Sequence, residues 1–219
     1  MIDAVLFDVD GTLVDTNYLH ATSWWQAFRQ YGHTVPTASV HRAIGMGSDK
    51  LLDAVLPSGR DRSADDAISS AHGALYAQYW DRLAPFDGAA DLLRACASRG
   101  ARVILASSAA EPEMRALRAA LGADDAIADA TSASEVEESK PAPDLVELAL
   151  RRAGVPADRA VFVGDTRWDV EAAARVGLPC VGVLSGGWAR AELEEAGAAA
   201  VYDDVRALLD DLDASPLNR

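Results

Sequence analysis

Several side chains that can do chemistry come directly after short apolar runs of the sequence, where a buried strand would end. These residues follow the runs at 4–7, 103–106 and 161–163, and they are Asp8, Asp10, Ser107, Ser108 and Asp165. Ligands of open α/β sheets bind at the carboxyl ends of the strands. Carboxylates and hydroxyls from distant parts of the chain are therefore predicted to converge on one point.

One lysine, Lys140, stands before a helical pattern and is predicted to join this group. The 20 Lys and Arg residues include only two Lys, Lys50 and Lys140, and a Lys makes a compact point-charge contact that Arg does not. Three carboxylates are too many for one apolar pocket without a cation, and oxygen ligands select a hard ion, most often Mg²⁺. Such a positive hole suits a phosphoryl group. One carboxylate could attack phosphorus while another exchanges protons with the leaving oxygen and with water.

Predicted strands and helices alternate along the chain, and these elements must position the residues named above. Apolar runs predict strands at residues 4–7, 102–106, 160–163, 180–184 and 200–202. Helical patterns lie between them, at 87–98, 112–121, 144–153, 169–176 and 205–212. This alternation predicts an α/β fold with a doubly wound parallel sheet.

The region from residue 16 to residue 83 breaks the alternation. Its patterns predict helices at 17–31, 38–44, 49–56 and 64–82, and no strand. We therefore expect an inserted all-α unit at residues 15–83, with the catalytic core at 1–14 and 84–219. A chain of 219 residues is long enough for one core domain with an insertion of this size.

The composition of the chain limits which binding partners and which cellular compartment are expected. The net charge of −14 makes nucleic acid and anionic membranes poor partners. The local positive hole instead favours a small phosphorylated metabolite, and we expect a monomer or a weak homo-oligomer. Two cysteines, Cys96 and Cys180, imply no disulfide framework. No run is long enough to cross a bilayer, and residues 1–3 lack the basic flank of a signal peptide. A cytoplasmic location is the expectation.

These motifs, taken in order, resemble those of the haloacid dehalogenase superfamily. The resemblance covers essentially the whole chain and is carried by Asp8-Val9-Asp10-Gly11-Thr12, Ser107, Lys140 and Gly164-Asp165-x-x-x-Asp169. The helical insertion resembles the C1-type cap of its phosphoglycolate phosphatase and β-phosphoglucomutase-like branch. The resemblance implies a Rossmann-like core and Mg²⁺-dependent hydrolysis of a small organic phosphate monoester.

The resemblance also assigns the reacting groups. Asp8 matches the nucleophile that forms an aspartyl-phosphate, and Asp10 matches the general acid and base. Ser107 and Lys140 match the phosphate-binding residues, and Lys140 also steadies the nucleophile. Ser108 competes with Ser107 as the phosphate-binding hydroxyl, because either could stand at the strand end.

Metal ligands follow from the same resemblance. Asp8, Asp165 and the backbone carbonyl of Asp10 match the Mg²⁺ ligands. Asp169 matches a carboxylate that orients a metal-bound water or Lys140, although an acid at this place also favours the start of a helix.

Four residues of the insertion resemble groups that reach the substrate in capped relatives. They are Thr16, His20, Gly45 and Lys50. A structural role for His20 and a solvent-facing role for Lys50 stay open as alternatives.

Two other activities of the superfamily are alternatives. A sugar phosphomutase needs a site for a second phosphate, and Ser48 stands where such mutases place an Arg. A phosphonoacetaldehyde hydrolase uses a Schiff-base lysine, which Lys50 resembles, but that branch lacks the acid found here at Asp10.

Overall fold

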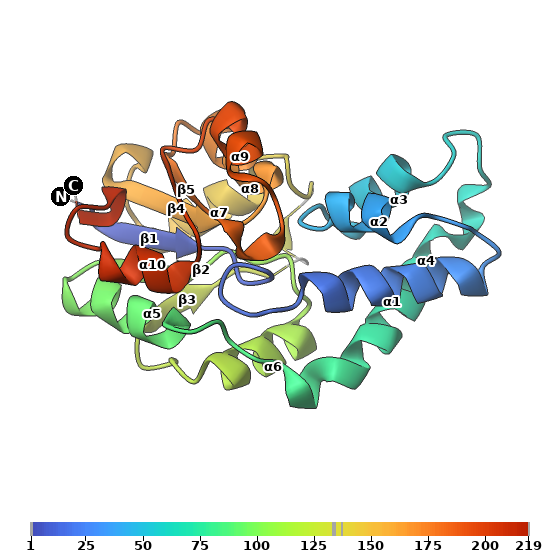
Figure 1. The fold of residues 1–219 in the computed structure, drawn as a ribbon, viewed down its shortest axis with the longest axis horizontal. Helices are drawn as coiled ribbons and strands as arrows, with labels where there is room; N and C mark the ends of the chain where they lie inside the picture. The colour runs from blue at the N-terminus through green and yellow to red at the C-terminus, as the bar shows by residue number, and fades with distance from the viewer. Residues whose placement is uncertain (1, 133–134, 137, 219) are drawn as a thin grey trace.

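A single parallel sheet forms the centre of the molecule. The computed structural model describes residues 2–132, 135–136 and 138–218, and within these ranges six strands lie in the order β3-β2-β1-β4-β5-β6 (Figure 1). The strands are β1 (Ala4–Phe7), β2 (Arg102–Leu105), β3 (Ile127–Ala130), β4 (Ala160–Gly164), β5 (Cys180–Val183) and β6 (Ala200–Tyr202). This arrangement confirms the predicted doubly wound, Rossmann-like class. The strand order reverses between β1 and β4, which is where ligands bind in such sheets.

The first strand occupies the centre because both of its faces are apolar. All four residues of β1 are fully buried. It pairs in parallel with β2 on one side and with β4 on the other. Since successive side chains point to opposite faces, Val5 and Phe7 enter one core cluster while Ala4 and Leu6 enter the other.

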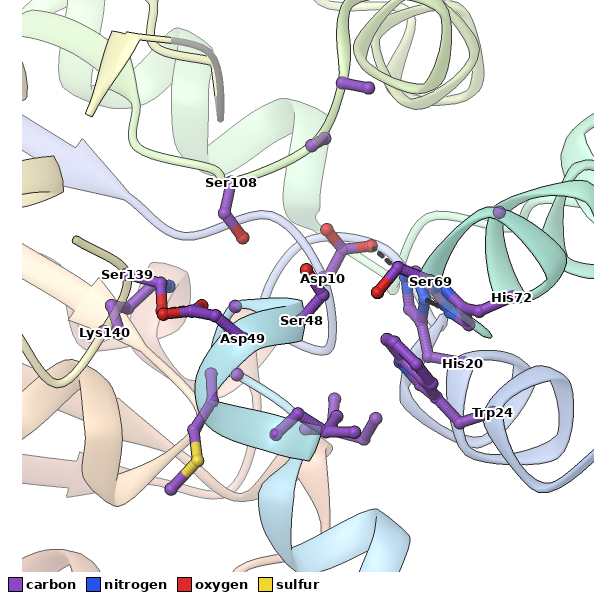
Figure 2. Close-up of a pocket in the computed structure, with 18 of the residues that line it drawn as sticks. Asp10, His20, Trp24, Ser48, Asp49, Ser69, His72, Ser108, Ser139 and Lys140 are labelled. Carbon is purple, nitrogen blue, oxygen red and sulfur yellow. Dashed lines mark hydrogen bonds and ion pairs between the residues drawn. The ribbon is translucent and has the colours of Figure 1, made fainter. Parts of the chain in front are cut away.

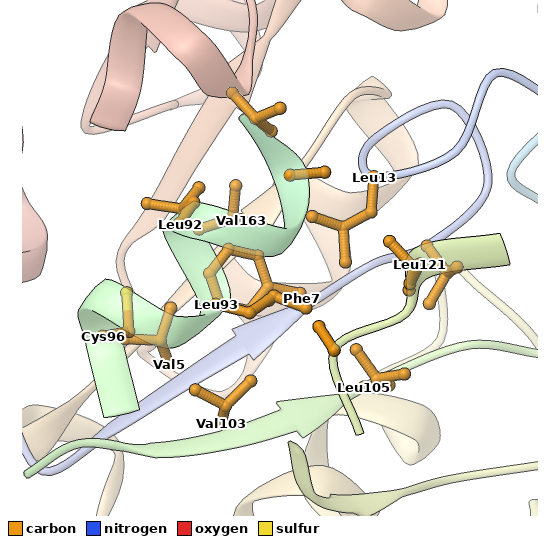
Figure 3. Packing of buried hydrophobic residues seen from close by; sticks show 14 of the residues in the cluster. Val5, Phe7, Leu13, Leu92, Leu93, Cys96, Val103, Leu105, Leu121 and Val163 are labelled. Atoms are coloured by element: carbon orange, nitrogen blue, oxygen red, sulfur yellow. The ribbon is translucent and has the colours of Figure 1, made fainter. Parts of the chain in front are cut away.

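Helices cover both faces of the sheet. One face packs against α5 (Ala89–Ser98), α6 (Glu111–Leu121) and α10 (Val205–Asp210), and the other against α7 (Asp144–Ala153), α8 (Arg167–Arg175) and α9 (Arg190–Ala196). Figure 3 shows Leu92 and Leu93 of α5 over Phe7 of β1. Cys96 and Cys180 are buried free thiols. No helix of the described ranges is both long and apolar enough to span a membrane.

The remaining helices form a group of their own, which we call the helical segment (residues 17–82). It contains α1 (Asn17–Gln30), α2 (Thr37–Ala43), α3 (Ser48–Val55), α4 (Asp65–Tyr76) and a 3-10 turn (Ala77–Arg82). It has a separate hydrophobic cluster that includes Phe28 and Leu52. The segment lies beyond the carboxyl end of β1, to the right of the sheet in Figure 1.

Two elements were not expected from the sequence. Strand β3 lies at one edge of the sheet, and only Ile127 of its four residues is buried, so it has no apolar run to reveal it. Helix α9 has seven residues, of which only Leu193 is buried. With a single buried apolar residue, α9 presents no apolar helical period in the sequence.

Candidate active site

A buried salt bridge lies at the carboxyl end of β1. Lys140 Nζ donates to Asp8 Oδ1 at 2.6 Å and to Asp169 Oδ1 at 2.7 Å. All three side chains are at most 8% exposed. Thr166 fixes the second oxygen of Asp169, because its N–H and its hydroxyl both donate to Oδ2. Asp169 therefore orients Lys140 and also caps the start of α8.

Asp165, at the carboxyl end of β4, is held on both oxygens. Thr12 Oγ1 donates to Oδ1 at 2.9 Å, and Asn17 Nδ2 donates to Oδ2 at 2.7 Å. The neighbouring chain approaches so closely that a Cβ on Gly186 would lie 1.7 Å from Asp165 Oδ2. Gly11, with φ +78°, also leaves no room for a side chain, since a Cβ there would lie 2.3 Å from Asn17 Nδ2. Thr12 and Asn17 were not singled out from the sequence, although Thr12 belongs to the first motif.

The carboxylates at this point outnumber the cations. Oxygens of Asp8, Asp165 and Asp169 all lie within 4.8 Å of one another, and Lys140 is the lysine that faces them. Burial raises the pKa of Asp8 well above its usual value although Lys140 opposes the rise. Burial together with Asp169 raises the pKa of Asp165 to about 7. Oxygen-only donors with this surplus of negative charge suit a hard divalent cation, so the residues fit a Mg²⁺ site.

Asp10 faces the helical segment rather than the salt bridge. Its Oδ1 accepts a hydrogen bond from Thr16 Oγ1 at 2.7 Å and lies 3.3 Å from His20 Nε2. Burial acts to raise the pKa of Asp10, but the hydrogen bond and charge of His20 and the Thr16 hydroxyl lower it overall. Burial acts to lower the pKa of His20, but the partnership with Asp10 raises it overall. The pair therefore holds a proton beside the cavity.

Aromatic and imidazole rings from α1 and α4 stand behind this pair (Figure 2). His20 Nδ1 lies 3.1 Å from His72 Nε2, and the His72 ring stacks on Trp24 with centroids 4.1 Å apart. Burial first, and then the charge of His20, lower the pKa of His72 to about 2, so it is neutral. Glu113 Oε1 lies 3.6 Å from His20 Nε2. His72 and Glu113 carried no recognisable sequence signal, because only the folded chain brings α4 and α6 to this place.

The two candidate hydroxyls after β2 have different surroundings. Ser108 lines the cavity, and Figure 2 shows it above Asp10. Ser107 is buried, and its Oγ accepts a hydrogen bond from Ala109 N–H at 3.0 Å. In this structure Ser108 is thus the hydroxyl that faces the cavity, while Ser107 orders the turn before α6.

These groups surround a cavity of about 400 Å³ between the sheet and the helical segment. Asp8 and Lys140 line it at the strand ends, and His20, Trp24 and His72 line it from the helical segment. Asp10 lies between these two groups, beside His20 (Figure 2). This volume lies within the range of small-ligand sites.

The loop between α2 and α3 forms another wall. Gly45 lines the cavity, and with φ +98° its Cβ would lie 2.9 Å from Thr166 Oγ1. Lys50 is not among the described residues that line the cavity, and its Nζ donates to Glu138 Oε2 at 2.8 Å. Thr16 and Gly45 are thus brought to the site, whereas Lys50 lies at its rim.

Known proteins resemble this chain along almost its whole length. The sequence pattern of the haloacid dehalogenase-like hydrolases matches residues 2–177. A phosphoglycolate phosphatase from Rhodospirillum rubrum is 34% identical, over 96% of this chain and 90% of its own length.

Solved structures agree with the sequence relatives. A hydrolase from Pseudomonas syringae superposes with a TM-score of 0.91 at 31% identity, covering 96% of this chain and 98% of its own. A CbbY variant from Rhodobacter sphaeroides in complex with xylulose-(1,5)bisphosphate superposes with a TM-score of 0.78 at 28% identity, covering 95% and 96%. The chain therefore belongs to the haloacid dehalogenase-like hydrolases and is a phosphatase of that family.

Proposed function

We propose that this protein hydrolyses phosphate monoesters of small molecules, with Asp8 as the nucleophile and Asp10 as the acid and base. The observation that carries this proposal is the contact of Lys140 with Asp8, at 2.6 Å, at the end of a cavity that Asp10 also lines. The phosphoglycolate phosphatase among the relatives supports the same chemistry.

The reaction proceeds in two displacements. A carboxylate oxygen of Asp8 attacks phosphorus, the bond from phosphorus to the ester oxygen breaks, and Asp10 gives that oxygen a proton so that it leaves as an alcohol. Ionised Asp10 then accepts a proton from water, whose oxygen attacks the phosphorus of the aspartyl-phosphate. The bond from phosphorus to Asp8 breaks, and inorganic phosphate is released. His20 shares its proton with Asp10 and so holds this carboxyl ready for both steps.

The remaining charges hold the phosphoryl group. Lys140 and the hydroxyl of Ser108 line the same cavity as Asp8 and bind the oxygens of the phosphoryl group. Asp8, Asp165 and the backbone carbonyl of Asp10 would hold Mg²⁺. When bound, Mg²⁺ acts as a Lewis acid toward a phosphoryl oxygen.

The helical segment serves as the cap of this site. We assign residues 15–83 to the cap and residues 1–14 and 84–219 to the core. The separate hydrophobic cluster of the helical segment supports this division, as does the position of the cavity between its rings and the strand ends.

Phosphate release from a panel of small phosphate esters tests the proposal. Wild-type protein is assayed with Mg²⁺ and with EDTA, beside Asp8→Asn and Asp10→Asn. We expect release that needs Mg²⁺ and is lost in Asp8→Asn. With p-nitrophenyl phosphate, whose leaving group needs no proton, brief acid quenching should trap a phosphorylated aspartate in Asp10→Asn, because the first displacement proceeds and the second lacks its base. Release that persists in Asp8→Asn would contradict the assignment of the nucleophile.

A further inference from the structure

Among the described residues, the half of the cavity that faces the helical segment offers no free cation to a second negative charge, because its His20 already faces the carboxylates of Asp10 at 3.3 Å and Glu113 at 3.6 Å. Among the described residues that line the cavity, Lys140 is the single lysine and there is no arginine. Lys140 is already bonded to two carboxylates at the phosphoryl end. The sequence from residue 131 to residue 139 contains neither Lys nor Arg.

The cations of the helical segment are engaged elsewhere. Five arginines bond to other groups. Arg60 and Arg62 pair with Asp53, Arg29 donates to Thr34 Oγ1, and Arg82 donates to a backbone carbonyl. The fifth, Arg42, pairs with Glu192 and lies 3.4 Å over the Trp188 ring.

The sixth cation, Lys50, is held at the rim. Its Nζ contacts Glu138 at 2.8 Å, and its side chain is 29% exposed. The residue before Lys50 on the same helix, Asp49, does line the cavity, but it is acidic. Its side chain accepts a hydrogen bond from Ser139 Oγ at 2.8 Å. Glu113 also lines the cavity. Burial raises the pKa of Glu113 to about 7, so this carboxyl is charged only in part at neutral pH. A carboxylate or a second phosphate on the leaving group would still meet the carboxylate of Asp49 in a confined space and find no free Lys or Arg among the described lining residues, which is costly.

Apart from His20, Asp49 and Glu113, the described polar side chains on this side of the cavity are hydrogen-bonding and uncharged at neutral pH. Ser48 and Ser69 contribute hydroxyls, and neutral His72 contributes an imidazole. Trp24 adds an aromatic edge. Such a lining suits an alcohol that carries hydroxyl groups over a short carbon chain.

Resting on the proposed phosphatase function, we infer that the leaving group of the substrate is an uncharged, hydroxyl-bearing alcohol. The physiological ester is then a polyol or sugar monophosphate. Phosphoglycolate, whose hydrolysis names the Rhodospirillum rubrum relative, and a bisphosphate both carry an additional negative charge and fall outside this class.

Matched esters separate the charge of the leaving group from its size. The first set has three esters with two-carbon leaving groups that differ mainly in the charge of the far end. This end is neutral in hydroxyethyl phosphate, negative in phosphoglycolate and positive in phosphoethanolamine. Sorbitol 6-phosphate and 6-phosphogluconate repeat the neutral and negative comparison at sugar size. We expect kcat/KM for each neutral ester to exceed that of its anionic partner by at least about tenfold. The neutral ester should also exceed phosphoethanolamine, because Asp49 and Glu113 already have Ser139 and His20 as partners and the ammonium group would lose its hydration.

Two serine variants test whether the missing cation is the cause. Ser69 lines the cavity, whereas its neighbour Ser70 is exposed and does not. Ser69→Arg should raise the ratio of kcat/KM for 6-phosphogluconate over sorbitol 6-phosphate by about fivefold or more. Ser70→Arg adds the same charge on the same helix and should leave the ratio unchanged.

The outcomes distinguish this inference from the proposed function. Preference for phosphoglycolate, a bisphosphate or phosphoethanolamine over the neutral esters would overturn the inference while leaving the phosphatase intact. Equal effects of Ser69→Arg and Ser70→Arg would overturn it too, because the cavity charge would then not determine selection. Failure to release phosphate from every ester, including the generic p-nitrophenyl phosphate, would instead overturn the proposed function.

Discussion

At the scale of single residues, the site depends on buried charges that only partly balance. Lys140 bridges Asp8 and Asp169, while Asp165 is held by neutral donors alone. Removing one member of a buried ion pair leaves an uncompensated charge, which costs far more than losing an exposed pair. The two lysines of the chain therefore make a matched comparison.

Lys140→Met should destabilise the metal-free protein by about 3–5 kcal/mol, because Asp8 and Asp169 lose their common partner. Lys50→Met removes the same charge from the more exposed pair with Glu138, and it should cost at most about 1 kcal/mol. Urea unfolding followed by circular dichroism measures both free energies. Equal losses would show that burial does not govern the Lys140 bridge.

Thr12→Val should weaken Mg²⁺ binding about 10–100-fold, because Asp165 loses the hydroxyl that orients its Oδ1. The measurement is the Mg²⁺ concentration that gives half-maximal activity, together with calorimetry of Mg²⁺ binding. Thr131→Val serves as the control, since this buried hydroxyl donates to backbone carbonyls instead of a carboxylate. A half-maximal concentration unchanged by Thr12→Val would show that Asp165 needs no such support.

At the scale of elements, two threonines at helix starts do different things. Thr166 caps α8 in a reciprocal capping box with Asp169. Thr16 occupies the same position before α1, but it makes no side-chain cap bond there, because its hydroxyl is donated to Asp10. One threonine contributes to the helix and the other to the site.

Thr166→Ala should therefore lower the free energy of unfolding by about 0.5–2 kcal/mol, and Thr16→Ala by less. Thr16→Ala should instead lower kcat about fivefold, the rate equivalent of one ordinary hydrogen bond, and Thr16→Ser should restore it. Parallel urea unfolding and steady-state kinetics provide the comparison. A kcat for Thr16→Ala equal to that of wild type would contradict the role given to this hydroxyl.

The elements also explain what the sequence could predict. The bounds of β1, β6 and α7 match the expected ranges, because short apolar runs mark the two strands while Pro143 before and Gly154 after mark the ends of α7. Asp8 and Asp165 could be expected to meet, since the ends of parallel strands share one edge of the sheet. Strand β3 escaped prediction because an edge strand needs few buried residues. Asn17 and His72 escaped because helical periodicity does not reveal how the helical segment sits over the sheet.

At the scale of the whole molecule, the net charge of −14 opposes the approach of an anionic ester. Salt should screen this repulsion, since the Debye length falls to about 10 Å at 0.1 M. Raising NaCl from about 10 to 150 mM at constant free Mg²⁺ should increase kcat/KM about two- to threefold through KM alone. If kcat/KM falls as the salt concentration rises, the local positive charge of the site, and not the net charge of the protein, determines how fast the ester binds.

The attachment of α1 to the floor of the site constrains how this enzyme could be rebuilt. Asn17 is the first residue of α1, yet its amide bonds to Asp165 at the end of β4, and the preceding Thr16 bonds to Asp10. A protein engineer who transplants helices from a relative by cutting at residue 15 would remove the hydrogen bonds that Thr16 and Asn17 give to Asp10 and Asp165. A graft that begins after Asn17 keeps both supports with the recipient. The junction of a functional chimaera should therefore be placed within α1, after Asn17, and not in the loop that precedes the helix.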